Sequence, residues 1–300
     1  MQPTRAGARG NPSAPGGAQP QREGNLILDA ARAHGIDPGV FEAFNQADSE
    51  SCVAASIGYG LVLVALAQND PGTLAFVKAH RDVPSINYAY HKMRQLECRR
   101  SGQCSCGPFC TDTCNADCGS LVSVGLEIFE EGVPPATVWP EDRPDDKRLA
   151  KLAEKDPRMG ADHLFYLDTF RPIDTSALDV LEALREGQPV VINLRVWSNQ
   201  KTFFTHGAPS YVRGYGANNM TKTVDPYNDA YRLPPASGPT PENYGHCLLI
   251  YGYSLDHQAF LVRNSFGPDW GYMGDFSIGF DQVTPSQIFQ TVALTSASTK

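Results

Sequence analysis

Apolar residues form their longest uninterrupted run early in the chain. Residues 52–68 (CVAASIGYGLVLVALAQ) are apolar on almost every side, which predicts a helix buried between two layers of structure. Residue types that cap helices stand directly ahead of this run, so we expect the helix to begin at or near Cys52 (the capping types are Asp48, Ser49 and Ser51).

Two further stretches of the first half have the spacing of amphipathic helices. Residues 89–98 and 121–132 place apolar side chains mainly on one face. Gly132 is followed by two prolines, which predicts the end of the second of these helices. The first half of the chain is therefore expected to be mainly helical.

The pattern changes after about Pro157. Three short segments are rich in Val, Ile, Leu and aromatic residues and are separated by Gly, Pro and Asn, as strands are (residues 188–197, 246–255 and 258–266). A helix at 176–188 is expected to pack on them, and the long segment 197–244 is expected to be a functional loop region. Helices first and strands later indicate an α+β protein, with a helical lobe at 25–155 and a β-rich lobe at 156–300.

Residues 1–24 differ from both lobes in composition. They are mostly Pro, Gly, Ala and Gln without periodic apolar residues, so we expect a flexible segment. They also lack the short apolar core of a secretory signal, and the chain has no run of eighteen uncharged apolar residues. A membrane-spanning segment is therefore not expected.

Charge and composition narrow the class of protein. The formal net charge is −8 and the pI is near 5.4, whereas a general binder of nucleic acid needs a concentrated basic face. No nucleic-acid partner is therefore expected. With 300 residues, of which 41% are hydrophobic and 19% charged, the chain can bury a complete core, so disorder throughout is excluded.

The predicted position of Cys52 suggests a chemical role for its thiol. A thiol becomes a strong nucleophile when it loses its proton, and a helix N-terminus and a neighbouring imidazole both lower its pKa. His246, at the start of a predicted strand, is the candidate for that imidazole. If the two strands around Leu255 form a hairpin that turns there, His246 faces Asn264, whose amide oxygen would orient the ring.

Three motifs resemble the signature motifs of the papain-like cysteine peptidases. They are Gln46 six positions before Cys52, then Gly-His ahead of a predicted strand, then RNSFGPDWGYMGDF at residues 263–276. They occur in the order found in that family, and the resemblance covers roughly residues 38–283, closest in type to divergent bacterial and large-virus members. It implies one peptidase domain of two lobes, helical and β-barrel-like, with the active site in the cleft between them.

The resemblance also implies the role of each catalytic residue. Cys52 would be the nucleophile, His246 the general base and acid, and Asn264 the residue that orients the imidazole. Gln46 would supply the side-chain donor of the oxyanion hole, beside the backbone N–H of Cys52. The implied reaction is hydrolysis of a polypeptide substrate through an acyl-enzyme by a monomeric endopeptidase that needs no metal or organic cofactor.

Six residues are implied in substrate binding (Gly119, Ser120, Tyr244, Gly245, Cys247 and Phe266). Gly119 and Ser120 stand where the family has a glycine pair that lets the substrate backbone approach. Tyr244 and Cys247 are expected near an apolar pocket that accepts the second residue before the cut.

The sequence departs from the family pattern at four positions. Val53 replaces the tryptophan after the nucleophile, Phe266 replaces a shielding tryptophan, and Cys247 replaces a small residue after the histidine. Ser49 replaces a half-cystine, so the usual disulfide there is absent. None of these changes removes a catalytic group, and a phenyl ring at 266 can still exclude water from the His246–Asn264 pair.

Six of the eight cysteines lie together in residues 98–118 (Cys98, Cys104, Cys106, Cys110, Cys114 and Cys118). Disulfides, a zinc site and unpaired thiols all remain open, although the spacing is not that of a known zinc signature. We expect this insertion to stabilise a loop and to take no part in the chemistry.

Two other functions compete with peptidase activity. One is a binding module on an inactive peptidase fold, with the cysteine-rich insertion as its contact surface. The other is acyl transfer of the transglutaminase kind, which usually orients the histidine with an aspartate where this chain has Asn264. The compartment is undecided; cytosolic synthesis followed by packaging in a virion or by release would fit both the missing signal and the clustered cysteines.

Overall fold

The computed structural model describes most of the chain in eight ranges (residues 23–46, 49–80, 82–101, 119–139, 161–206, 226–227, 229–237 and 241–300). The predictions for residues 1–22 and for the cysteines from 104 to 118 lie outside these ranges. Cys98 and Tyr244 belong to a described helix and strand, but their side chains are outside the description.

The described part of the first half is helical, as predicted. The helix that begins at Cys52 and those that cover 89–98 and 121–132 are all present, and two more helices accompany them. Their bounds are α1 (Leu26–His34), α2 (Cys52–Ala67), α3 (Pro71–His80), α4 (Ile86–Ser101) and α5 (Val122–Glu131). A short 3-10 helix, η1 (Pro38–Phe41), lies between α1 and α2.

The described strands form one seven-stranded sheet in which every pairing is antiparallel. The order is β2-β7-β3-β4-β5-β6, and β1 pairs with β4. The bounds are β1 (Glu23–Asn25), β2 (Phe165–Pro172), β3 (Val190–Trp197), β4 (Pro241–Ser254), β5 (Ala259–Arg263), β6 (Asp275–Gly279) and β7 (Ile288–Thr299). Two helices, α7 (Ala177–Arg185) and α8 (Ser198–His206), accompany the strands.

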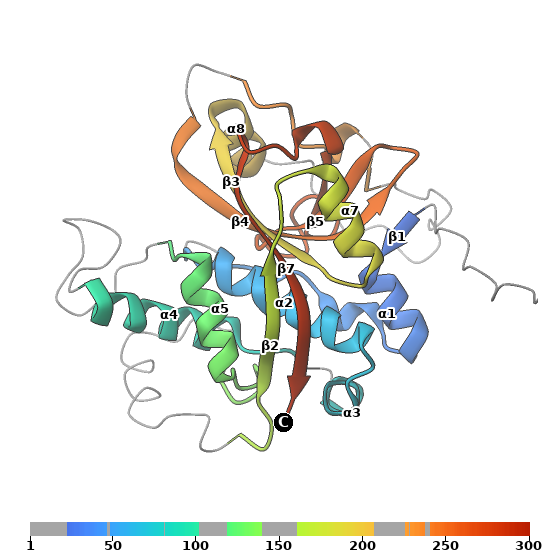
Figure 1. Ribbon diagram of the computed structural model, residues 1–300, viewed down its shortest axis with the longest axis vertical. Coiled ribbons are helices and arrows are strands. Elements are labelled where there is room, and N and C mark those ends of the chain that lie inside the picture. Colours follow the sequence, from blue (N-terminus) through green and yellow to red (C-terminus); the bar gives the residue numbers. More distant parts are fainter. Residues whose placement is uncertain are drawn as a thin grey trace, which may run out of the picture.

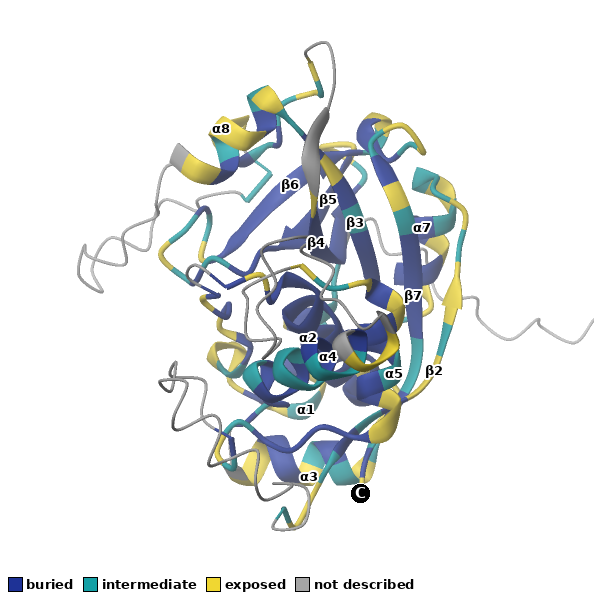
Figure 2. Ribbon diagram, turned by 90° about the vertical axis from the view of Figure 1, so that its left-hand side faces the viewer, coloured by how far each residue is buried: buried dark blue, intermediate teal, exposed yellow. Residues whose placement is uncertain are grey.

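Helices and strands form two layers, which confirms the α+β class. Figure 1 shows α2, α4 and α5 on one side and most of the sheet on the other, with β2 and β7 extending between the two. Figure 2 shows that the buried residues gather in α2 and in most of the strands, whereas β2, α3 and α8 expose much of their outer surface.

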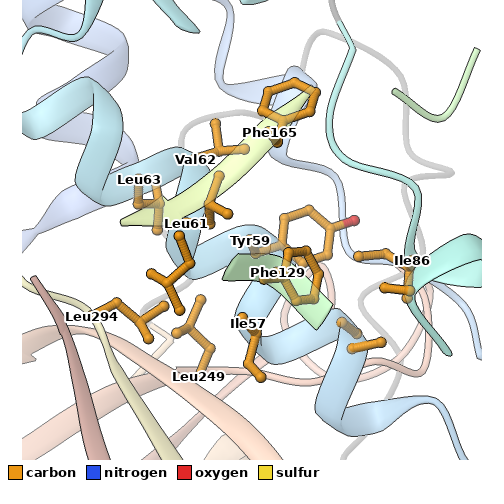
Figure 3. Close-up of a cluster of buried hydrophobic side chains, with 14 of the residues drawn as sticks. Ile57, Tyr59, Leu61, Val62, Leu63, Ile86, Phe129, Phe165, Leu249 and Leu294 are labelled. Carbon is orange, nitrogen blue, oxygen red and sulfur yellow. The ribbon is translucent and has the colours of Figure 1, made fainter. Parts of the chain in front are cut away.

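The central helix α2 lies between the layers, as its pattern predicts. It contacts β4 and β7 in the sheet and also α4 and α5, and every residue from Cys52 to Leu66 is buried. Figure 3 shows Ile57 and Leu61 of this helix beside Leu249 and Leu294 of the sheet. Burial on all sides fixes the position of the helix end that carries Cys52.

Two glycines let neighbouring side chains approach α2 closely. A Cβ atom on Gly60 would lie 2.5 Å from Leu294 Cδ1 and 3.0 Å from Leu249 Cδ1. A Cβ atom on Gly58 would lie 2.6 Å from Ile86 Cδ1. The sheet therefore packs closely against the backbone of α2 at Gly60, and α4 packs closely against it at Gly58.

Within the described ranges, no single helix is long and apolar enough to cross a membrane. In this part of the chain, α2 and α3 together have the length and apolar composition of a membrane span, but the two helices are bent by 113° where they meet.

Two predicted boundaries need correction. The segment 197–244, expected to be a loop region, begins with the helix α8, whose sequence SNQKTFFTH has too many polar residues to reveal it. Residues 23 and 24, expected to be flexible, belong to β1 and pair with Ser254 and Tyr253 of β4.

The predicted hairpin forms, but its register differs from the expectation. Ser254 pairs with Ala259 and Leu249 with Arg263, so the turn is centred after Leu255, and an irregularity follows Ile250. Continuing this register places residue 266 opposite His246, two positions beyond Asn264. A shift of two residues keeps a side chain on the same face of a strand, so His246 and Asn264 remain diagonal neighbours.

Candidate active site

Cys52 is the first residue of α2 and is 5% exposed. The first N–H groups of a helix have no acceptor inside the helix, so they can bond to other groups. Here the N–H groups of Cys52 and Val53, together with that of Cys247 in β4, donate toward the Cys52 sulfur. The nucleophile predicted from sequence therefore lies against the strand that carries His246.

Burial nevertheless raises the pKa of the Cys52 thiol to about 11, with a smaller contribution from the negative charge of Glu50. The N–H groups at the helix N-terminus do lower this pKa, as expected, but desolvation outweighs them together with the N–H of Cys247. Burial also lowers the pKa of His246 to about 4, against the opposing effect of its bond to Asn264. At pH values between about 4 and 11 both the Cys52 thiol and the His246 imidazole are therefore neutral.

His246 and Asn264 come together as a hydrogen-bonded pair. The imidazole Nε2 lies 2.8 Å from Asn264 Oδ1, and the two residues are only 7% and 2% exposed. The orientation of the Asn264 amide is fixed independently, because the same oxygen accepts the N–H of Ser265 at 2.8 Å. Nε2 must then carry the proton, which leaves Nδ1 unprotonated and able to accept one.

The backbone around Asn264 is also held in place. Its N–H donates to the carbonyl of Gly274 at 2.9 Å, next to the paired ends of β5 and β6. The amide nitrogen Nδ2 is buried and has no acceptor among the described residues. The side chain therefore serves His246 through its oxygen alone.

Aromatic rings cover the His246–Asn264 pair. Phe266 stacks on the imidazole with ring centroids 5.1 Å apart and an interplanar angle of 24°. Phe204 of α8 meets the imidazole edge-on at 5.2 Å, and Trp270 stacks on Phe204 at 6.2 Å. Phe266 was predicted as a shield, whereas Phe204 was not, because its only signal is a pair of adjacent phenylalanines in a polar stretch.

Gln46 is joined to the segment after Asn264 by a short antiparallel ladder, the 44–46/265–267 ladder. The N–H of Gln46 donates to the carbonyl of Ser265 at 2.8 Å, and the N–H of Gly267 donates to the carbonyl of Phe44 at 3.0 Å. Asn45 and Phe266 are the paired residues of the antiparallel β-bridge that these two hydrogen bonds form. The residues proposed for the oxyanion hole and for imidazole orientation thus lie on two bonded segments.

The side chain of Gln46 is also oriented by neighbours. Its Oε1 accepts the hydroxyl of Ser265, and its Nε2 donates to the carbonyl of Ser49. This second bond uses one of the two amide hydrogens. Ser49, which replaces a half-cystine, in turn donates its hydroxyl to the carbonyl of Gln46 at 2.7 Å.

The predicted substrate-binding residues are spread over two places. Gly119 and Ser120 lie just before α5, and the hydroxyl of Ser120 donates to Glu97 Oε2 at 3.3 Å. Gly245 is exposed on β4 next to His246. The structure places Cys247 in the core beside α2, where it is 2% exposed and bonded to Ser56.

The described residues include no group of three or more His, Cys, Asp or Glu side chains arranged to hold a metal ion. The prediction of a zinc site concerned the cysteine-rich insertion, most of which lies outside these ranges.

Comparisons with known proteins agree with this architecture. No protein-family model matches the sequence. The chain is 21% identical over 256 residues to an uncharacterized peptidase C1-like protein of Acanthamoeba polyphaga mimivirus, an alignment that covers 84% of this chain and 68% of that protein.

Two solved structures are similar in fold. Xylellain, a cysteine protease from Xylella fastidiosa, matches with a TM-score of 0.61 and 17% identity over 92% of this chain and 86% of its own. The bromelain protease from Ananas comosus matches with a TM-score of 0.51 and 14% identity over 90% and 97% of the two chains. These similarities confirm the papain-like α+β fold.

Proposed function

We propose that this protein, which has the fold of the papain-like cysteine peptidases, hydrolyses peptide bonds within polypeptides with Cys52 as its nucleophile. His246 acts as general base and acid, Asn264 orients it, and Gln46 helps to stabilise the oxyanion. The substrate class follows from the relatives, which are described as proteases or as peptidase-like.

The reaction starts from a neutral pair. As the Cys52 sulfur attacks the carbonyl carbon of the substrate, Nδ1 of His246 takes the thiol proton. The tetrahedral intermediate then collapses, the C–N bond breaks, and the imidazolium gives its proton to the departing amine. In the second half a water molecule loses a proton to His246 and attacks the thioester, and Cys52 leaves and regains its proton.

Two donors stabilise the negative oxygen of the tetrahedral intermediate. The first is the backbone N–H of Cys52 at the start of α2, and the second is the remaining hydrogen on Gln46 Nε2. Removing one such donor raises the barrier by about 2.7–4 kcal/mol in comparable sites. The bond from Ser265 to Gln46 Oε1 keeps this amide from rotating.

The observation that supports this function most is the buried bond of 2.8 Å between His246 and Asn264. The imidazole of His246 stacks on Phe266. The next residue in the chain is Cys247, whose backbone N–H donates to the sulfur of Cys52. A histidine that served only in packing would not need a fixed tautomer next to a thiol.

Labelling and turnover together test the proposal. The reduced protein is treated with a thiol-directed peptidase inhibitor, and the modified residue is identified by intact mass and peptide mapping. Activity is measured on a blocked fluorogenic peptide. We expect one adduct on Cys52, and loss of turnover by more than about 10³-fold in Cys52→Ala.

Cys247→Ala is the matched control for labelling, because Cys247 is the other free cysteine among the described residues and is also buried, on β4. This variant should keep the adduct on Cys52, because it leaves the proposed nucleophile in place. Absence of an adduct on a demonstrably reduced Cys52, together with no turnover, would contradict the proposal and favour a binding module.

A further inference from the structure

Cys247 is a buried thiol on β4 that the proposed mechanism does not use. It is 2% exposed and, with Cys52, is one of the two free cysteines among the described residues. The resemblance to the papain-like peptidases predicts a small residue at this position, so the thiol is a feature of this chain and not of the fold. The contacts of Cys247 therefore indicate what the thiol can do.

The side chain of Cys247 faces α2. Cys247 and Leu249 of β4 belong to the core cluster that contains α2, whereas Leu248 between them belongs to the cluster that contains α7. Successive side chains of a strand point to opposite faces of the sheet. The Cys247 sulfur is therefore directed at the helix that begins with Cys52.

Two contacts fix the level of Cys247 along this helix. Leu249 meets the helix at Gly60, where a Cβ atom would lie 3.0 Å from Leu249 Cδ1. Two residues earlier on the strand, the Cys247 thiol bonds to Ser56, one turn earlier on the helix. The two steps agree in length, because two strand residues span about 6.6 Å and four helix residues about 6 Å. Strand and helix therefore continue side by side toward Cys52.

The next turn of α2 brings Cys52 to Cys247. Ser56 is four residues after Cys52, so the two lie on the same face of the helix. The Cys247 side chain bonds to Ser56, while its backbone N–H donates toward the Cys52 sulfur. The donor nitrogen is bonded to the Cys247 Cα, which places that Cα next to the Cys52 sulfur, as a disulfide requires. Rotation of the Cys247 side chain to another staggered position then turns its sulfur from Ser56 toward Cys52.

We propose that Cys52 and Cys247 form an oxidation site, at which the two thiols join in a reversible disulfide. The pairing rests on the contacts between α2 and β4. Its consequence, loss of the nucleophile until the disulfide is reduced, rests on the proposed peptidase function. The disulfide also protects Cys52 from oxidation to sulfinic and sulfonic acid, which thiol reductants do not reverse.

Hydrogen peroxide is the oxidant in two balanced steps. In the first, the Cys52 sulfur attacks a peroxide oxygen, the O–O bond breaks, and the released oxygen leaves as water with the thiol proton, so that Cys52 becomes a sulfenic acid. In the second, the Cys247 sulfur attacks the sulfenic sulfur, the S–O bond breaks, and the hydroxyl leaves as water with the Cys247 proton. Two thiols are oxidised and one peroxide is reduced to two waters.

The order of the two steps follows from burial. Cys52 is 5% exposed and Cys247 only 2%, so peroxide meets Cys52 first. Burial raises the pKa of both thiols, which makes the first step slow at neutral pH. The experiment therefore uses a series of peroxide concentrations up to a large excess.

Peptide mapping without reductant tests the pairing. The full chain is reduced, freed of reductant, treated with hydrogen peroxide and then denatured in the presence of an alkylating reagent. Trypsin releases the two cysteines in peptides 33–78 and 233–263, each of which contains no other cysteine. We expect these peptides to be cross-linked, with the alkylated form of each lost in proportion and regained after treatment with dithiothreitol.

Cys247→Ala separates a pair of thiols from a single reactive thiol. Without its partner, Cys52 should be oxidised beyond the sulfenic acid, so peptide 33–78 gains oxygen and dithiothreitol does not restore its alkylation. Cys247→Ser keeps the size and polarity of the residue and should behave as the alanine variant does. Urea denaturation shows that each variant is folded.

Three results would overturn the pairing. They are absence of the cross-link at every peroxide concentration, a cross-link from Cys52 to the cysteine-rich insertion instead, and equal recovery of Cys52 in Cys247→Ala and in the unaltered protein. None of these readouts requires peptidase activity. A chain that forms the Cys52–Cys247 cross-link but hydrolyses no peptide when reduced would overturn the proposed function and leave the pairing in place.

Discussion

His246 is held in the fold without a charge, because burial lowers its pKa to about 4. Its surroundings are the rings of Phe204 and Phe266 and the amide oxygen of Asn264. None of these groups can balance a positive charge as a carboxylate would. At the scale of single residues, the imidazole of His246 is therefore unprotonated at neutral pH and can accept a proton.

The stability of the fold should depend on pH through this residue. In the unfolded chain the imidazole has a pKa of 6.5, and in the folded protein about 4, so the unfolded state binds more protons between these values. The free energy of unfolding therefore falls as pH drops from 6.5 to 4, by about 3 kcal/mol in total.

Urea denaturation at several pH values within this window measures the effect. The matched variant His246→Gln cannot titrate at this position, so its stability should depend less on pH by the same amount. If the free energy of unfolding changes equally with pH in the two proteins, groups other than His246 cause the pH dependence.

Removing the orienting amide should slow the reaction. Asn264→Ala leaves the imidazole N–H buried without an acceptor, which costs about 1–3 kcal/mol and lets the ring rotate. We expect kcat for the fluorogenic peptide to fall by at least about tenfold.

Asn264→Asp is the informative comparison for this change. A carboxylate at the same place accepts the same N–H but favours the imidazolium, so it should raise the pKa of His246 above about 4 and move the pH profile with it. If Asn264→Ala and the unaltered protein have equal kcat, Asn264 does not act as the orienting residue.

At the scale of elements, α2 determines where Cys52, the proposed nucleophile, lies. The helix is buried along its whole length, and Gly60 meets the sheet where a larger side chain has no room. Any displacement of the helix would move Cys52 relative to His246 on β4. Packing in the middle of the helix therefore supports the geometry at its end.

Gly60→Val tests this packing. Its Cβ alone would lie 2.5 Å from Leu294 Cδ1, so the variant should lower the free energy of unfolding by about 1–3 kcal/mol through overpacking. Gly119→Val is the matched control, because a Cβ there meets no atom within 4 Å. Equal stability of the two variants in urea denaturation would contradict the close approach at Gly60.

The sequence predicted those elements whose pattern is strong along the chain. Residues 52–68 are apolar throughout, and the structure has α2 there. The position of Asn264 near His246 was also predictable, because a register error of two residues does not change the face of a strand.

Features that depend on distant contacts could not be predicted in this way. The helix α8 has no clear apolar face, so Phe204 could not be placed on His246 from sequence. The raised pKa of Cys52 arises from desolvation by several elements, which a helix N-terminus alone does not reveal. The partners of Glu97 likewise become visible only when α4 and α5 are side by side.

At the scale of the whole molecule, a buried ion pair joins the sheet to the segment that leads to Gln46. Arg263 at the end of β5 donates from Nε to Asp275 Oδ1 at 2.7 Å and from Nη2 to Oδ2 at 3.0 Å. Its Nη1 donates to the carbonyl of Phe41, and Tyr251 donates to Asp275 at 2.8 Å. Burial by itself would lower the pKa of Arg263, but the charge of Asp275 and the bonds to it raise this pKa above its usual value, so the guanidinium stays charged.

Breaking this ion pair should destabilise the protein globally. Arg263→Met leaves Asp275 buried without its counter-charge and removes the bond to Phe41, so we expect a loss of about 3–5 kcal/mol in the free energy of unfolding.

The double variant Arg263→Met with Asp275→Asn removes both charges and keeps an acceptor for Tyr251. It should recover part of the loss, and a double-mutant cycle from urea denaturation measures the coupling. Additive effects of the two substitutions would show that the pair does not act as a unit.

The 44–46/265–267 ladder also determines when the site can exist during synthesis. Gln46 and Ser265, whose side chains bond to each other, are 219 positions apart. At about 5–20 residues per second, the ribosome adds Asn264 roughly ten to forty seconds after Cys52. Throughout that interval the nascent chain has the Cys52 thiol but neither Asn264 nor Phe266, so the candidate site is incomplete in a chain stalled before β5.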